Sequence, residues 1–161
     1  MEKIQRDDIN ITDEKYMRIA IELSKAAKRK GEVPIGAVIV LNNKIIAKAY
    51  NKKERLGDAT CHAEILAIKK ASKKYRDFRL ENACMYVSLE PCVMCMGAVL
   101  SARISRLVFG ARQDKPNILG AYEINERAGL NHKCDIRGGV LEKEASEIIS
   151  DYFKCKRKGK N

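Results

Sequence analysis

Apolar positions recur along the chain with two periods, and these predict alternating helices and strands. Between residues 13 and 30 apolar side chains return every three to four positions and Gly31 follows, which is typical of an amphipathic helix and its end. The next apolar runs, 33–41 and 44–50, are rich in strand-forming residues and flank an Asn-Asn dipeptide at 42–43 that tolerates the left-handed backbone of a tight hairpin. We therefore expect a helix followed by two antiparallel strands.

The rest of the chain predicts two strand–helix units and a closing helix. The expected segments are, in order, a polar loop over 51–60, a helix beginning near Cys61 or His62, a strand over 83–89, a helix over 92–102 opened by Pro91, a strand over 106–110, a long loop over 111–130, a short strand near 134–140 and a helix over 142–158. The apolar stripe of the helix after the polar loop is expected to consist of Ile65, Leu66, Ile68 and Ala71. The pattern predicts an α/β fold in three layers, α/β/α, with a mixed sheet of about five strands and ligands at the strand-to-helix junctions.

Composition narrows the class of protein. The chain has 161 residues, of which 45% are hydrophobic and 33% charged, so it can bury one core, and we expect a single domain over 1–161 rather than a disordered or fibrous chain. The first twelve residues lack the apolar core of a signal peptide, and no apolar run approaches the ~18 residues of a membrane span. We expect no membrane association and a cytoplasmic location, where the six cysteines stay reduced and serve as metal ligands or buried hydrophobic residues.

The charge of the chain is strongly positive. Lys and Arg number 32 against 21 Asp and Glu, a formal net charge of +11, which attracts polyanions. The closing helix ends in the basic segment KCKRKGK. This segment is compatible with a nucleic-acid contact or with a merely solvated helix end.

Cys92-x-x-Cys95 stands at the start of a predicted helix, where the spacing lets two sulfurs reach one ion and the helix dipole favours thiolate. Alone, this pair is equally compatible with a redox dithiol, half of a structural zinc site or two buried cysteines. His62-Ala63-Glu64 also stands at a helix start, and together with Pro91 and the two cysteines it matches the H-x-E…P-C-x-x-C signature of zinc nucleobase deaminases.

The signature assigns a chemical role to each of these residues. His62, Cys92 and Cys95 are the predicted ligands of one Zn²⁺ per subunit, and three protein ligands leave the fourth position for water. Glu64 is the predicted catalytic residue, which takes a proton from the water, delivers it to the substrate ring and helps protonate the departing ammonia.

Cys61 offers a rival arrangement, because Cys61, His62, Cys92 and Cys95 could form a closed structural zinc site. Consecutive helical residues diverge by about 100°, which speaks against a shared ion for Cys61 and His62. The same geometry applies to His62 and Glu64, which are two residues apart and can meet only at an irregular first helical turn.

Further stretches carry a family resemblance over nearly the whole chain. The stretches are EVPIGAV from Glu32, HAE from His62, SLEPCVMCMG from Ser88, SARISRLVFGAR from Ser101, LNH from Leu130 and SDYFKCKR from Ser150. The chain resembles bacterial tRNA-specific adenosine deaminases, which implies a cytidine deaminase-like fold. The middle stretches are shared in looser form by guanine, cytosine and deoxycytidylate deaminases, so the substrate assignment depends on the LNH stretch and the basic last helix.

The resemblance implies conversion of the wobble adenosine to inosine in a tRNA anticodon, with an arginine tRNA as the expected substrate. An anticodon stem-loop presents unpaired bases that can be splayed into a pocket. By carry-over, the expected substrate-binding residues are Asn51, Asn131, Phe153, Lys154, Lys156 and Arg157. Phe153 could instead pack into the core, as a lone aromatic on an amphipathic helix often does. The resemblance also implies a homodimer.

Two other functions stay open from the sequence: deamination of a free base or nucleotide, and a non-catalytic zinc-stabilised RNA-binding module, against which the intact Glu64 weighs. A few positions also depart from the family pattern, namely Ala59, Cys61, Gln113 and the segment 115–120. They leave the metal chemistry untouched but put the loop contacts and the tRNA preference in question.

Overall fold

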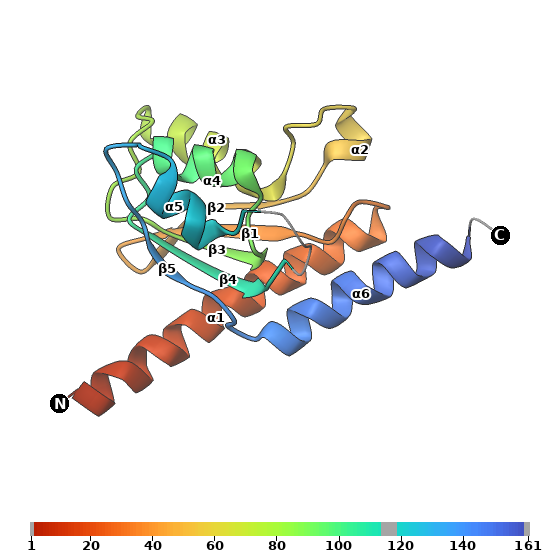
Figure 1. Ribbon diagram of the computed structural model, residues 1–161, viewed down its shortest axis with the longest axis horizontal. Helices are drawn as coiled ribbons and strands as arrows, with labels where there is room; N and C mark the ends of the chain where they lie inside the picture. The colour runs from red at the N-terminus through yellow and green to blue at the C-terminus, as the bar shows by residue number, and fades with distance from the viewer. Residues whose placement is uncertain (1, 114–118, 160–161) are drawn as a thin grey trace.

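The computed structural model describes residues 2–113 and 119–159 (Figure 1). Its elements are α1 (Glu2–Arg29), β1 (Gly36–Leu41), β2 (Lys44–Tyr50), α2 (Lys53–Leu56), α3 (Ala63–Tyr75), β3 (Cys84–Leu89), α4 (Val93–Ser101), β4 (Arg106–Ala111), α5 (Ala121–Arg127), β5 (Asp135–Arg137) and α6 (Glu142–Lys158). No helix within these described ranges is long and apolar enough to span a bilayer.

The strands form one mixed sheet in the order β2-β1-β3-β4-β5. β1 runs antiparallel to β2 and β3, whereas β3, β4 and β5 are parallel. Helices α1 and α6 cover one face of the sheet, and α3, α4 and α5 cover the other (Figure 1). The predicted three-layer α/β fold with five strands is confirmed. Because the parallel strands share a direction, the segments that follow β3 and β4 emerge at the same edge.

The β1–β2 hairpin follows the prediction at its turn but not at its start. Asn42 and Asn43 adopt φ of 50° and 59°, the left-handed backbone expected of this dipeptide. β1 begins at Gly36 instead of residue 33, since Pro34 has no amide hydrogen to give to a ladder. A Cβ at residue 36 would lie 2.1 Å from the Ala20 carbonyl oxygen, so this glycine lets α1 pack directly on the strand.

Three other predicted segments are corrected. α1 begins at Glu2 rather than near residue 13, and the predicted loops 51–60 and 111–130 contain the short helices α2 and α5. The predicted apolar stripe of α3 is confirmed for Ala71, which is buried, and for Leu66 and Ile68, which are half-buried and pack against the core, whereas Ile65 is half-buried and is not among the core contacts. The fully buried apolar positions of α3 are Ala63, Ala67 and Ala71, whose small side chains let the helix lie close to the sheet.

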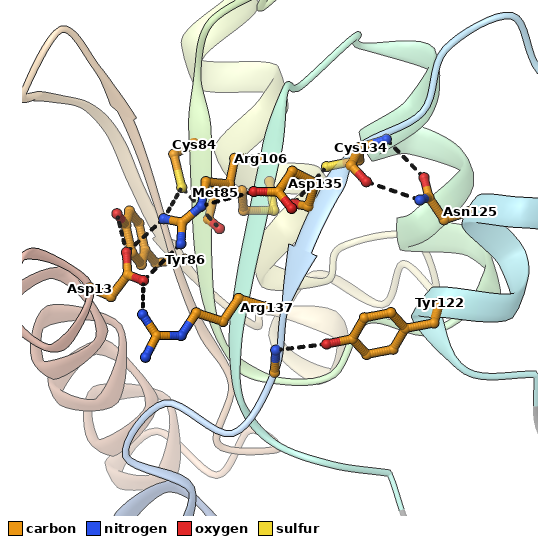
Figure 2. A network of polar contacts seen from close by, with 11 residues as sticks. Asp13, Cys84, Met85, Tyr86, Arg106, Tyr122, Asn125, Cys134, Asp135 and Arg137 are labelled. Carbon is orange, nitrogen blue, oxygen red and sulfur yellow. Dashed lines mark hydrogen bonds and ion pairs between the residues drawn. The ribbon is translucent and has the colours of Figure 1, made fainter. Parts of the chain in front are cut away.

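A buried carboxylate joins α1 to the strands (Figure 2). Asp13 is 1% exposed and accepts hydrogen bonds from both terminal nitrogens of Arg106 at 2.7 and 2.8 Å. It also accepts one from Arg137 at 2.7 Å and one from the Tyr86 hydroxyl at 3.0 Å. Arg106 is the first residue of β4 and Tyr86 lies in β3, so this network fixes α1 to the amino-terminal part of the parallel strands.

Candidate active site and metal centre

The structure brings His62, Cys92 and Cys95 together, although 30 residues separate His62 from Cys92. The His62 Nδ1 atom lies 3.7 Å from Cys92 Sγ and 3.5 Å from Cys95 Sγ, and the three ligand atoms all lie within 4.8 Å of one another. Tetrahedral ligands about 2.0–2.3 Å from one zinc ion would be roughly 3.5 Å apart. The spacing and the donor set therefore fit Zn²⁺.

Helix starts position these side chains. His62 is the N-cap of α3, with an extended backbone (φ −71°, ψ 155°), and Cys92 is the N-cap of α4 with a similar conformation. Because His62 stands outside the helix, the helical spacing that separates residues two apart does not apply to it and Glu64. Cys61 is buried in the preceding loop and is not part of the ligand group formed by the described residues. That group therefore has three members.

Glu64 lies in the first turn of α3 and is 2% exposed. Its Oε2 atom has no hydrogen-bond partner in the described part of the chain. Burial raises the pKa of this carboxyl to about 7. A buried polar atom without a partner costs roughly 1–3 kcal/mol, and such atoms in native structures often mark catalytic positions. The orphaned oxygen therefore fits a bound water or substrate beside the ligand group.

The three ligand side chains are poised to bind a cation. A hydrogen bond from Cys95, with His62 as a further partner, lowers the pKa of Cys92 to about 4. The same bond raises the pKa of Cys95, whose thiol donates to the Cys92 thiolate. The hydrogen bond with Cys92 raises the pKa of His62. Metal binding needs thiolate and neutral imidazole, so a metal ion would displace the protons held here.

A cavity of about 660 Å³ opens above this group, within the size range of small-molecule clefts. It is lined by Val33, Ile35, Asn51, Lys53, His62, Leu89, Cys92, Ala111, Arg112, Gln113, Ser146, Ile149, Ser150 and Phe153. Asn51 is 3% exposed, and its Oδ1 accepts a hydrogen bond from the Lys53 amide at 3.1 Å. Phe153 is 42% exposed, so it lines the cavity instead of packing into the core. Two predicted binding residues, Asn51 and Phe153, thus line the same cavity as the metal ligands His62 and Cys92.

The other expected substrate-binding residues lie elsewhere. Lys154, Lys156 and Arg157 are exposed on the last turns of α6, next to the cavity but not in its wall. Asn131 is exposed before β5 and does not line the cavity. Its neighbour His132 lies 2.8 Å from the Ile104 carbonyl oxygen, which precedes β4, so Asn131 lies at the opposite end of the parallel strands.

Some of the positions that depart from the family pattern line the cavity and others do not. Gln113 lines the cavity, whereas Ala59 is exposed in the loop before His62. Residues 115–118 lie outside the described residues, and Gly120 is the N-cap of α5.

Sequence reasoning missed four residues that shape the cavity. Lys53 and Arg112 lie in its wall. The Glu90 carboxylate accepts hydrogen bonds from the Gln113 amide at 3.0 Å and the Ala121 amide at 2.8 Å, which fixes both ends of the segment between them. Glu32 plays a similar part for α2. Lys53 and Arg112 could have been found from their position in the chain, because they follow the ends of β2 and β4, where cavities form in α/β sheets.

A buried glutamate and a His-Cys-Cys group beneath a cavity, in a three-layer α/β/α fold, define a zinc-dependent deaminase. Residues 10–111 match the family model of the cytidine and deoxycytidylate deaminase zinc-binding region. The chain is 44% identical over 149 residues to the tRNA-specific adenosine deaminase of Bacillus subtilis, covering 92% of each chain. It is 41% identical over 150 residues to the Haemophilus influenzae protein of that name, covering 92% of this chain and 87% of the relative.

Solved structures give the same picture. The chain matches a structure from a study of A-to-I editing by tRNA:A34 deaminases at the wobble position, with a TM-score of 0.76 and 38% identity, covering 82% of this chain and 96% of that one. It also matches the guanine deaminase of Nitrosomonas europaea with a TM-score of 0.74 and 26% identity, covering 86% and 83%. The chain belongs to the cytidine and deoxycytidylate deaminase family, in the group of the tRNA-specific adenosine deaminases.

Proposed function

We propose that this protein hydrolyses the wobble adenosine of a tRNA anticodon to inosine and releases ammonia. The observation that carries this proposal is the buried Glu64 oxygen, which has no partner among the residues the structure describes, beside the His-Cys-Cys group and under a cavity whose wall includes helix α6. The names of the relatives supply the substrate class.

His62, Cys92 and Cys95 would hold the zinc ion. When bound, zinc acts as a Lewis acid that lowers the pKa of water to near 7. Glu64 accepts a proton from the attacking water and delivers it to the ring nitrogen beside the attacked C6 carbon. It then takes the remaining proton of the hydroxyl group added at C6 and gives it to the amino group, which leaves as ammonia when the C6–N bond breaks. A carboxyl whose pKa is about 7 can act both as base and as acid near neutral pH.

The cavity wall places the base against apolar surface. Val33, Ile35, Leu89 and Ala111 line the cavity, and they would exclude water from the faces of a bound adenine. Asn51, buried at the same wall, would bind the target nucleotide.

Helix α6 would hold the flanking nucleotides. The exposed ring of Phe153 is available to stack on an unpaired base of the anticodon loop, and Lys154, Lys156 and Arg157 would neutralise nearby phosphates. Asn131 is too remote from this cavity for the same role within one subunit. We further propose an arginine tRNA as substrate and a homodimer, both by analogy with the family. A tRNA substrate would place the enzyme in the cytoplasm.

The likeness to guanine deaminase supports a second candidate, deamination of a free base or nucleotide. The basic end of α6 carries several cations, which favours a polyanionic tRNA over a free base, which has no phosphate, and over a nucleotide, which has phosphate at one position only.

A substrate panel tests the proposal. The purified protein should carry about one zinc per chain and produce inosine and ammonia from an anticodon stem-loop with adenosine at the wobble position. A stem-loop with guanosine there is the matched control and should release no ammonia. Ammonia release from guanine or cytosine with none from either RNA would refute the tRNA assignment and leave the deaminase chemistry in place.

A further inference from the structure

Lys53 occupies a defined place in the cavity wall. It is the first residue of the four-residue helix α2, its side chain is exposed, and it lines the same cavity as His62 and Phe153. Figure 1 shows α2 and the carboxyl-terminal half of α6 at the same end of the molecule. The cavity therefore has a cationic residue on the α2 side as well as the basic helix α6.

The charged side chains that line the cavity wall are cationic. The lining residues include two cations, Lys53 and Arg112, and no carboxylate among the residues the structure describes. Arg112 already has an anionic partner, because its Nε atom lies 3.5 Å from Glu142 Oε1. For Lys53, the described ranges 2–113 and 119–159 contain no carboxylate within the 4.0 Å of a salt bridge. Its charge is therefore available to a ligand in the cavity.

A buried glutamate that the deamination chemistry does not use holds this lysine in place. Glu32 is 1% exposed, and its two oxygens accept hydrogen bonds from the backbone amides of Glu54 at 3.0 Å and Arg55 at 2.7 Å. The Asn51 Oδ1 atom accepts a hydrogen bond from the backbone amide of Lys53. A helix of four residues is not stable by itself, so α2 depends on these side chains for its position.

The position of Lys53 suits a phosphodiester ligand. A base that reaches the metal group would lie between the apolar side chains of the wall, and its sugar and phosphates would then extend toward the exposed lining residues, Lys53 in α2 and Phe153 in α6. An ammonium group on a flexible side chain binds phosphate as a point charge. A free base would leave this charge without a partner.

We propose that Lys53 binds a backbone phosphate next to the target nucleotide, and that Glu32 is the residue that positions it. This inference rests on the proposed function and deepens it, because it assigns a residue that selects a polynucleotide over a free base. It also explains why the Glu32 carboxylate is buried so close to the active site without taking part in the chemistry.

The test measures deamination of an anticodon stem-loop by the full-length zinc-loaded enzyme as a function of RNA and salt concentration. Lys53→Ala should raise KM about three- to tenfold, with a smaller effect on kcat, and should reduce the slope of log KM against log salt by about 0.7, the contribution of one single-strand phosphate contact. Lys53→Arg should restore most of the affinity. Lys73→Ala removes the same charge from exposed α3, outside the cavity, and should leave KM and slope within twofold of the wild-type values.

Glu32 is tested through its coupling to Lys53. Glu32→Gln places an amide donor against a backbone donor, so it should raise KM toward the value for Lys53→Ala while kcat shows that the enzyme remains folded. The double variant should be no worse than Lys53→Ala alone, because both changes remove one contact. As a control, the changes in KM caused by Glu32→Gln and Lys73→Ala should simply multiply when the two substitutions are combined.

The outcomes separate the two proposals. A wild-type enzyme that turns over no stem-loop would refute the proposed function itself. Normal wild-type turnover, with KM and salt slope unchanged in Lys53→Ala, would overturn the role of Lys53 alone. Multiplicative effects of Glu32→Gln and Lys53→Ala would overturn the positioning role of Glu32.

Discussion

Replacing Asp13 by Asn tests whether the network in Figure 2 holds the fold together. The change keeps the size of the side chain but removes the charge that Arg106 and Arg137 share. Breaking a fully buried ion pair costs about 3–5 kcal/mol. The arginine side chains are 26% and 37% exposed, so water compensates in part, and we expect a loss of about 2–4 kcal/mol. That is a large fraction of the roughly 5–15 kcal/mol that stabilises a domain.

Urea unfolding followed by circular dichroism measures this loss, with Asp135→Asn as the matched control. Asp135 also pairs with Arg106, at 3.3 Å, but it is 76% exposed, so its removal should cost less than about 1 kcal/mol. Equal midpoints for the two variants would refute the argument that burial makes Asp13 important.

The pH dependence of the same variant has a defined sign. Burial alone would raise the pKa of Asp13, but the hydrogen bond and charge of Arg106, with smaller contributions from Tyr86 and Arg137, outweigh it and lower the pKa below its ordinary value. A carboxylate whose pKa is lower in the folded than in the unfolded protein stabilises the fold. This stabilisation is fully present above the pKa of the unfolded chain, about 3.9, and is lost as the pH falls toward the pKa of the folded protein. The stability gap between wild type and Asp13→Asn should therefore stay constant from pH 7 to 5 and shrink below about pH 4. A gap that widens on acidification would contradict this assignment.

Three further predictions concern the metal group and the cavity above it. Glu64→Gln should keep about one zinc per chain, measured by atomic absorption, and lower kcat for inosine formation by about 10²- to 10⁴-fold, the usual contribution of general acid–base catalysis. Cys61→Ala should keep both zinc and kcat within about twofold; loss of zinc as complete as in Cys92→Ala would show a closed four-ligand site instead. Phe153→Ala should raise KM for the stem-loop about tenfold, since stacking on one base contributes about 1–3 kcal/mol, and an unchanged KM would return Phe153 to a packing role.

The long elements of the fold could be predicted from sequence because each carries its own periodicity. The hairpin, α3, α4 and α6 fall within a few residues of their expected positions. The short helices α2 and α5 could not be predicted, because four and seven residues are too few to show a period. Their positions depend on Glu32 and Glu90, whose contacts lie 22 to 31 residues away along the chain.

The same distinction divides the candidate site. The metal ligands and the catalytic glutamate could be predicted, because they belong to a sequence motif whose spacing reflects zinc binding and proton transfer. These residues are His62, Glu64, Cys92 and Cys95. The geometric objection to His62 and Glu64 disappears only in three dimensions, where His62 is found to be an N-cap and not a helical residue. The wall of the cavity depends on tertiary contacts that have no local signature, which is why Lys53 was missed. Asn131 was expected to bind substrate only by carry-over from the family, and it does not line the cavity.

The parallel strands place the stabilising Asp13 network and the active-site cavity at opposite ends. β3 and β4 run from the Asp13 network, at Tyr86 and Arg106, to the cavity, at Leu89 and Ala111. The six residues of β4 span about 17 Å at ~3.3 Å per residue. Perturbations farther apart than about 10 Å, without shared partners, generally add independently. Asp13→Asn should therefore lower the midpoint of unfolding while kcat, measured well below the melting temperature, stays within about twofold of wild type. A parallel fall in kcat would mean that α1 and the strand ends transmit strain along β3 and β4 to the metal group, and it would refute this independence.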